Sequence, residues 1–266
     1  MNRHLLLPLV LAGATALAGC GELRQAAATT TAPTTTISAT TSSSSTIAAT
    51  TSSSSTSTTT TLAWQRFPLT PPAPPTKRVI RRIETTDPVV FLTIDDGYTR
   101  DPRIPDLLAA HGATATLFIM PAAIRDDPAY FARFVALGGT VNSHTLHHEY
   151  MTELTEAEQR KEICRSAELI SERLGSPAGP YFRPPYGEWD GATVRAAAAC
   201  GMDRVVLWDI SVNNGTIYMP SGTIHPGDIL IFHFREDLYT DLEAVFAKLD
   251  ELGLSVARLE DYLPDG

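Results

Sequence analysis

The sequence lacks charge over a long N-terminal stretch. No charged residue lies between Arg24 and Arg66 of the 266-residue chain. Residues 27–62 include 26 Ser or Thr and, apart from three aliphatic residues, otherwise only Ala and Pro. Such a stretch has too little apolar surface to offset the entropy lost on ordering it. We therefore expect a disordered tether, which with the Pro-rich segment after it covers residues 20–76, and not a second folded domain.

Basic residues are also scarce. The chain has 21 Lys and Arg against 30 Asp and Glu, and residues 77–266 alone carry 18 against 29, a net charge of −11. Nucleic-acid binders concentrate Lys and Arg to contact phosphates, so this class of function is disfavoured. Residues 77–266 are numerous enough to bury one hydrophobic core. We expect them to form a single monomeric domain.

No apolar run is long enough for a comfortable membrane span of roughly 20 residues. The N-terminus has a basic residue, Arg3, an apolar run, and small residues before Cys20. This layout is typical of a secretory signal. Leu17-Ala18-Gly19-Cys20 resembles the lipobox of bacterial lipoproteins, which implies cleavage after residue 19 and a lipid on Cys20. The alternative is an ordinary secretory signal with an incidental cysteine, and in either case the domain lies outside the cytoplasm.

Cysteine is rare, with three in the chain. If Cys20 carries lipid, Cys164 and Cys200 remain, and an exported location permits a disulfide between them. Both fall on expected helices beside apolar neighbours, where two buried free thiols are equally compatible with the sequence. The sequence alone does not choose between these alternatives.

Short apolar runs alternate with helical patterns from residue 89 onward. Such alternation indicates an α/β domain with a parallel sheet, and the number of runs predicts an irregular (β/α) barrel of about seven parallel strands. The expected strands are Val89–Thr93, Thr114–Ile119, Thr140–Asn142, Tyr181–Arg183, Arg204–Trp208, Asp228–His233 and Ser255–Ala257. The expected helices are Pro102–His111, Pro128–Leu137, Thr155–Leu174, Gly191–Cys200 and Leu238–Leu252.

Polar residues follow five of these strands, at the ends where barrel enzymes carry their chemistry. They are Asp95-Asp96, Asn142-Ser143-His144, Arg183, Trp208-Asp209 and His233. Five such sets at one end of a barrel are difficult to explain by structure alone.

His144 and His148 are four residues apart, which is one helical turn, so both imidazoles can project to the same side. One carboxylate from Asp95-Asp96 completes a three-ligand set that leaves positions open for water and substrate, as in catalytic metal sites. Adjacent residues that leave a strand point in different directions, so the second Asp can remain free as a base. The alternative is a solvated surface loop that happens to hold three histidines.

At this point the sequence resembles the NodB-homology polysaccharide deacetylases, carbohydrate esterase family four. The motifs that carry the resemblance are T-I-D-D-G at Thr93–Gly97, H-T-L-H-H at His144–His148, R-P-P-Y-G at Arg183–Gly187 and I-F-H at Ile231–His233. They occur in the family's order, and the resemblance extends from Val89 to Leu263. It implies an irregular barrel that removes acetyl groups from N- or O-acetylated glycans with one divalent metal ion, zinc or cobalt.

The resemblance also assigns roles to single residues. It implies that Asp96, His144 and His148 hold the metal and that Asp95 is the base that activates water. Arg183 would pair with Asp95 and hold its charged form in place.

Two further roles come from the later motifs. The backbone N–H of Tyr186 would stabilise the oxyanion, and His233 would protonate the departing amine. Without the family context, the Arg183 segment could be a rigid loop with a surface ion pair, and His233 could be a satisfied core histidine.

The chain departs from the family at one motif. The pattern D-x-x-D-W is expected at residues 211–215, where this sequence has S-V-N-N-G. Asn-Asn-Gly is a good tight turn. Asn214 replaces the family's Asp that tunes the acid histidine, and Asp209 is the nearest carboxylate that could take over that role.

These observations leave three hypotheses. The first is a lipid-anchored, metal-dependent deacetylase of cell-wall glycan, with the N-acetyl groups of peptidoglycan favoured by location. The second is a wall-binding protein that retains the metal site without turnover, and the third is a secreted acetylxylan-type esterase.

Overall fold

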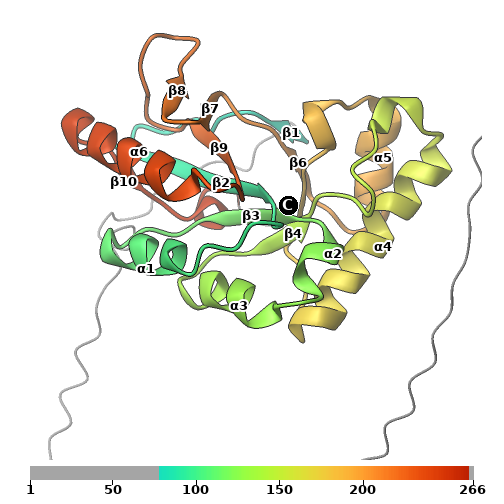
Figure 1. Ribbon diagram of the computed structural model, residues 1–266. Helices are drawn as coiled ribbons and strands as arrows, with labels where there is room; N and C mark the ends of the chain where they lie inside the picture. Colours follow the sequence, from blue (N-terminus) through green and yellow to red (C-terminus); the bar gives the residue numbers. More distant parts are fainter. Residues whose placement is uncertain (1–77, 264–266) are drawn as a thin grey trace, which may run out of the picture. The chain divides into compact units, whose positions relative to one another are not determined.

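The computed structural model describes residues 78–263 (Figure 1). The expected signal peptide, tether and lipidated Cys20 lie outside these residues. Within residues 78–263, no helix is both long and apolar enough to cross a membrane.

One curled, mostly parallel sheet organises the described residues, with β1 and β8 at its two ends. Its strand order is β1-β6-β5-β4-β3-β2-β9-β7-β8, and β10 pairs with β2. The strands are β1 Val79–Ile80, β2 Val89–Asp96, β3 Thr116–Ile119, β4 Val141–Ser143, β5 Tyr181–Phe182, β6 Arg204–Val206, β7 Ile210–Asn213, β8 Thr216–Tyr218, β9 Ile229–His233 and β10 Ser255–Val256. An isolated antiparallel bridge between Arg82 and Asp228 joins the segment after β1 to the start of β9. The result is a deformed, half-closed α/β barrel, which confirms the irregular (β/α) barrel that the sequence predicts.

All seven expected strands are present, and the described residues contain three more. The additional strands are β1, which has two residues, and the antiparallel hairpin of β7 and β8. The hairpin turn is Asn214-Gly215, where both residues have positive φ, 50° and 71°. This geometry suits a two-residue turn between right-twisted strands, so the Asn-Asn-Gly pattern marks a hairpin.

Five helices match the predicted ranges to within one or two residues, and a short helix, α2, is additional. The helices are α1 Arg103–Ala110, α2 Pro121–Ile124, α3 Pro128–Ala136, α4 Glu156–Leu174, α5 Gly191–Ala199 and α6 Leu238–Leu252. Helix α4 begins with the predicted Thr155–Glu158 capping box and ends at Gly175 in the left-handed conformation. Figure 1 shows the helices around the outside of the sheet, with α4 and α5 side by side.

The central strand β2 separates two parts of the core because its side chains alternate between its faces. Val90, Leu92 and Ile94 pack with residues of α1, α3 and α6. Phe91 packs on the other face with Phe118 and other inward residues. Continued alternation from Phe91 places Thr93 and Asp95 inside the barrel, and both are fully buried.

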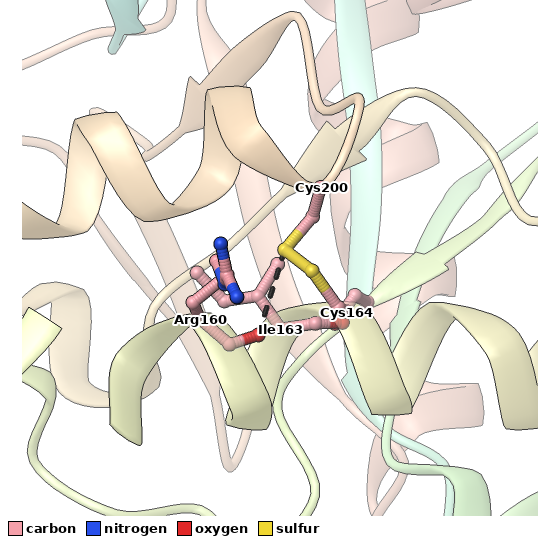
Figure 2. Close-up of a disulfide and its surroundings, with 5 residues drawn as sticks. Arg160, Ile163, Cys164 and Cys200 are labelled. Atoms are coloured by element: carbon pink, nitrogen blue, oxygen red, sulfur yellow. Dashed lines mark hydrogen bonds between the residues drawn. A yellow bond between two sulfur atoms is a disulfide. The ribbon is translucent and has the colours of Figure 1, made fainter. Parts of the chain in front are cut away.

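The two described cysteines form a disulfide, so the alternative of two free thiols is wrong. Cys164 and Cys200 have Cα atoms 5.0 Å apart and join α4 to the end of α5 (Figure 2). Cys200 Sγ also lies 3.5 Å from the carbonyl oxygen of Arg160. Disulfides persist in oxidising compartments, so this bond agrees with a location outside the cytoplasm.

Candidate functional site

The two predicted aspartates are the last two residues of β2. Asp95 is opposite His233 of β9 in the strand register, and Asp96 is opposite Ile119 of β3. Asp95 is buried, whereas the Asp96 side chain is 22% exposed. Asp96 has a φ of 77°, where the chain leaves the strand before Gly97. The strand therefore delivers one carboxylate to the barrel interior and one to its rim.

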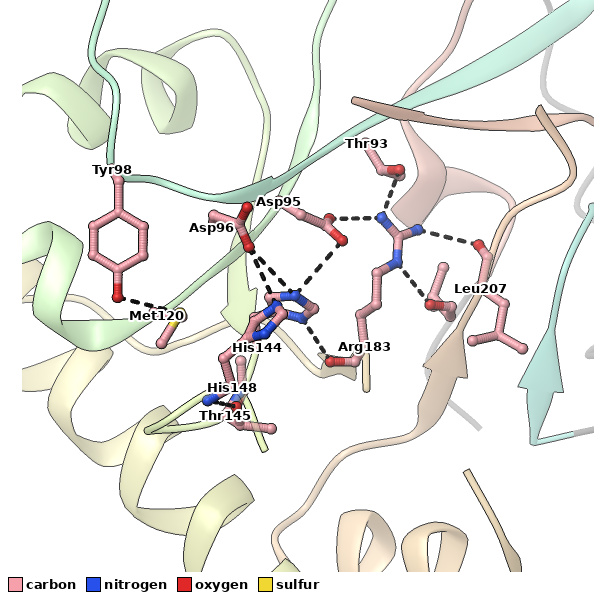
Figure 3. Close-up of polar contacts among 12 residues, drawn as sticks. Thr93, Asp95, Asp96, Tyr98, Met120, His144, Thr145, His148, Arg183 and Leu207 are labelled. Carbon is pink, nitrogen blue, oxygen red and sulfur yellow. Dashed lines mark hydrogen bonds and ion pairs between the residues drawn. The ribbon is translucent and has the colours of Figure 1, made fainter. Parts of the chain in front are cut away.

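Arg183 follows β5 and is completely buried. Its Nη1 donates hydrogen bonds of 2.8 Å to both Thr93 Oγ1 and Asp95 Oδ1 (Figure 3). Nε and Nη2 donate to the carbonyl oxygens of Val206 and Leu207, and the guanidinium lies 4.1 Å above the Phe118 ring. The predicted pairing of Arg183 with Asp95 is present. It is a buried pair and not the surface ion pair of the alternative interpretation.

His144 and His148 converge as predicted, but they lie on a loop and not on a helical turn. The loop follows β4 and has left-handed backbone at Thr145 and His148, with φ of 68° and 62°. His144 Nδ1 donates to the carbonyl oxygen of Arg183 at 2.8 Å, which leaves Nε2 available as a ligand atom. Burial lowers the pKa of His144, against the opposing effect of the two aspartates, and favours the neutral ring that metal binding requires.

Asp96, His144 and His148 offer three ligand atoms that all lie within 4.8 Å of one another. Asp96 Oδ1 is 3.7 Å from His144 Nε2 and 3.6 Å from His148 Nε2. Ligand atoms of a tetrahedral zinc site, with bonds of about 2.0–2.1 Å, stand about 3.3–3.4 Å apart. The separations and donor types therefore fit one divalent ion. Asp95 lies beside this cluster, with Oδ2 3.8 Å from His144 Nε2.

A residue that the sequence analysis did not identify holds the histidine loop. Glu162 of α4 accepts hydrogen bonds from the backbone N–H groups of Leu146 and His147, at 2.9 and 3.0 Å, and contacts the His147 ring. One signal was available in the sequence. Glu162 is one residue before Ile163 on the buried stripe of α4, where a carboxylate needs partners.

Tyr186 lies at the rim of the site. It is in the short 3-10 helix Pro185–Gly187 with a φ of 60°, and its ring packs edge-on against His148 at 4.7 Å between centroids. Tyr150 stacks on Tyr186 at 4.0 Å. Among residues 78–263, no acceptor for the Tyr186 N–H is present. The structure thus brings the ring of Tyr186, the residue whose backbone N–H is the predicted oxyanion donor, next to a predicted metal ligand.

His233 ends β9 beside Asp95, whereas Asp209 lies at the other end of that strand. The Asp209 N–H donates to the Ile229 carbonyl oxygen, and Ile229 is four residue steps along β9 from His233, about 13 Å. The structure therefore contradicts Asp209 as a replacement partner for His233.

The Asn213–Gly215 turn, which replaces the family's D-x-x-D-W motif, binds residues that follow β9 and not His233. The Asn214 N–H donates to Asp237 Oδ2 at 2.9 Å, and Asn213 Oδ1 accepts from Arg235. Neither contact involves His233.

Comparisons with known proteins agree with this geometry. Residues 82–205 match the family described as Polysaccharide deacetylase. The chain is 37% identical over 194 residues to an uncharacterized protein of Streptomyces coelicolor, covering 70% of this chain and 77% of that protein. It is 26% identical over 191 residues to the peptidoglycan-N-acetylmuramic acid deacetylase PdaA of Bacillus subtilis, covering 67% of this chain and 73% of that protein.

Solved structures show the same fold. PdaA, a family 4 carbohydrate esterase, superimposes with a TM-score of 0.60 at 21% identity, over 70% of this chain and 85% of PdaA. A pseudoenzyme of this esterase family from Bacillus anthracis superimposes with a TM-score of 0.61 at 22% identity, over 70% and 69% of the two chains. The family match and the sequence relatives show that the chain belongs to the polysaccharide deacetylases, and the solved structures show that it has the fold of the family 4 carbohydrate esterases.

Proposed function

We propose that this protein is a metal-dependent deacetylase of cell-wall glycan that acts on N-acetyl groups of peptidoglycan. The observation that carries the proposal is the cluster of Asp96, His144 and His148 beside the buried Asp95–Arg183 pair. A structural ion pair would not require three convergent ligand atoms at the open end of the barrel. Family membership supplies the reaction class, and PdaA is a relative whose name specifies a peptidoglycan sugar.

Asp96, His144 and His148 would hold one divalent ion, zinc or cobalt. A bound ion of this kind supplies Lewis acidity, which activates water near neutral pH and polarises the acetyl carbonyl. Asp95 Oδ2 accepts the proton of the attacking water, while Arg183 holds the other carboxylate oxygen. The Tyr186 N–H donates to the carbonyl oxygen as negative charge develops there.

The products are acetate and a free amine. When the C–N bond breaks, the leaving nitrogen takes a proton from His233. The starting state returns when Asp95 releases the proton that it took from water and His233 takes up a proton. His233 is suited to this role because it ends β9 beside Asp95, on the other side of β2 from β4 and its histidine loop.

We also propose that lipid on Cys20 anchors the chain to the outer face of the cell membrane. The proposal rests on Leu17-Ala18-Gly19-Cys20, and an anchor there, ahead of the Ser/Thr-rich residues 27–62, would keep the domain near the surrounding wall. The disulfide supports the extracytoplasmic side of this proposal.

A wall-binding protein without turnover is the second candidate. The observation that favours it is the loss of D-x-x-D-W, since the Asn213–Gly215 turn binds Asp237, Asp241 and Arg235 instead of His233.

Acetate release distinguishes these candidates. Purified protein loaded with zinc or cobalt is incubated with peptidoglycan, N-acetylglucosamine oligomers and acetylated xylan, with Asp96→Ala as the matched control. We expect the metal-loaded native protein to release acetate from peptidoglycan and the Asp96→Ala variant to release none. Release from xylan only would favour the secreted esterase. Sedimentation with peptidoglycan without acetate, on folded and metal-loaded protein, would favour the binder.

A further inference from the structure

The middle histidine of the H-T-L-H-H motif has no part in the chemistry above. The His147 side chain is 64% exposed, and its Nδ1 lies 2.7 Å from Glu162 Oε1. It therefore points away from the three ligand atoms and toward helix α4. Its partner, Glu162, is also the residue that binds the backbone of the histidine loop.

Glu162 is buried and has three partners on the loop. Its side chain is only 10% exposed, and Oε2 accepts both the Leu146 and the His147 N–H. A carboxylate that accepts three donors in a buried position makes strong, charge-assisted hydrogen bonds. These bonds join the loop to a long, capped helix.

The loop needs such support because its backbone is strained. Thr145 and His148 both adopt left-handed φ values without being glycine, a conformation that persists only where surrounding contacts fix it. The His148 N–H donates to Thr145 Oγ1 at 3.0 Å, which links the two strained residues. Leu146 and His147, the residues between them, are those that Glu162 binds.

The two histidine ligands depend on this support to different degrees. The His144 ring is held directly by the carbonyl oxygen of Arg183. Among residues 78–263, the His148 ring has no comparable hydrogen bond, and it faces Asp96 and the His144 and Tyr186 rings. The backbone of the loop therefore sets the position of His148.

We propose that Glu162 is a positioning residue that sets the metal affinity of the site by holding His148 in place. Glu162 is not itself a metal ligand. His147 binds Glu162 and is not a metal ligand either. The inference rests on the proposed metal site and adds a residue outside it. Groups outside the ligand set that orient the ligands usually contribute 10–100-fold in metal affinity, and an effect of this size is measurable.

The test measures zinc affinity, without substrate, by titrating metal-free protein in competition with a chromophoric chelator. Glu162→Gln keeps the volume of the side chain but removes its negative charge and leaves one acceptor oxygen, so the hydrogen bonds to the loop lose their charge-assisted strength. We expect about 10-fold weaker zinc binding for Glu162→Gln and up to about 100-fold for Glu162→Ala. The matched control is Glu168→Gln on the same helix, whose side chain is 61% exposed and pairs with Arg165, and its affinity should be unchanged.

A double-mutant cycle separates positioning from a general structural effect. If Glu162 acts through His148, adding Glu162→Gln to His148→Ala weakens zinc binding no further, whereas adding it to His144→Ala still does. Native affinity in Glu162→Gln would overturn the inference, as would an equal loss in the His148→Ala background. The readout is zinc affinity. Failure to release acetate would therefore refute the proposed function but would leave the inference about Glu162 unaffected. If Glu162→Ala does not fold, Glu162→Gln carries the test.

Discussion

Arg183 and Asp95 are 88 residues apart in the sequence and form a buried ion pair, with Nη1 2.8 Å from Oδ1. The pair occupies one carboxylate oxygen of Asp95 and leaves Oδ2 near His144. The adjacent Asp96 contacts both histidines and lies outside the Arg183 hydrogen bonds. Neighbouring residues of one strand therefore have different contacts, which supports the proposed division into a base and a metal ligand.

Asp95→Asn should retain one equivalent of metal and lose deacetylation by about 100-fold or more, because an amide cannot accept the proton of water. Its matched partner, Asp96→Asn, should lose metal affinity. Metal content by elemental analysis and acetate release are measured on the same samples. Loss of metal from Asp95→Asn with retention in Asp96→Asn would reverse the two assignments.

Asn214→Asp should raise acetate release near neutral pH and shift the alkaline loss of activity to higher pH. The substitution restores the carboxylate that the family motif carries at this position, and a carboxylate that reaches His233 would favour the protonated imidazole that the leaving amine needs. Asp tolerates the left-handed backbone of this turn, so the hairpin should persist. The pH dependence of kcat is measured for native, Asn214→Asp and Asp209→Asn proteins.

Asp209→Asn serves as the control because Asp209 lies at the opposite end of β9 from His233. A large shift in the Asp209→Asn profile would contradict the position of Asp209 at the far end of β9, and no shift in Asn214→Asp would contradict a tuning role for a carboxylate at position 214.

Glu260, which lies outside the metal cluster, should make the stability of the protein depend on pH. Burial raises its pKa, opposed by hydrogen bonds from Thr140 and Thr116 and by the charge of Arg258. Its contribution to stability is therefore full below the unfolded-state pKa of about 4.3 and is lost as pH rises through the higher folded-state value. The loss is about 1.4 kcal/mol for each unit by which folding raises the pKa.

Glu260→Gln removes this titration and keeps an oxygen that can accept from the two threonines. The unfolding free energy of the native protein minus that of Glu260→Gln, from urea denaturation, should fall between pH 4.5 and pH 8. A difference that is constant or rises with pH would show that folding does not raise the pKa of the Glu260 carboxyl.

Cys20→Ser should prevent lipid attachment and release the protein from the membrane or leave the precursor unprocessed. The expectation follows from Leu17-Ala18-Gly19-Cys20 at the end of the apolar run. Mass spectrometry of the mature N-terminus provides the direct readout. An unmodified Cys20 on processed protein would refute the lipid anchor.

Local signals account for the parts of the fold that the sequence predicts well. The Thr155–Glu158 capping box and Gly175 fix both ends of α4, because each satisfies backbone groups that a helix end leaves unpaired. The strands around β2 are buried on both faces and therefore appear as continuous apolar runs.

Long-range contacts determine what the sequence could not show. The His144–His148 spacing suggests a helical turn, but Glu162, fourteen or more residues later, stabilises a strained loop instead. The Cys164–Cys200 bond depends on the packing of α4 against α5, which spacing does not reveal. The distance of Asp209 from His233 follows from the register of β7 against β9.

The central claim is that Asp96, His144 and His148 bind one ion on which deacetylation depends. Its most direct test is acetate release from peptidoglycan while metal-free protein is titrated with zinc or cobalt. We predict release that rises with added metal, levels off at one equivalent, disappears with excess chelator and is absent from Asp96→Ala. Release unaffected by chelator, or no release from folded protein that holds one equivalent of metal, would contradict the claim.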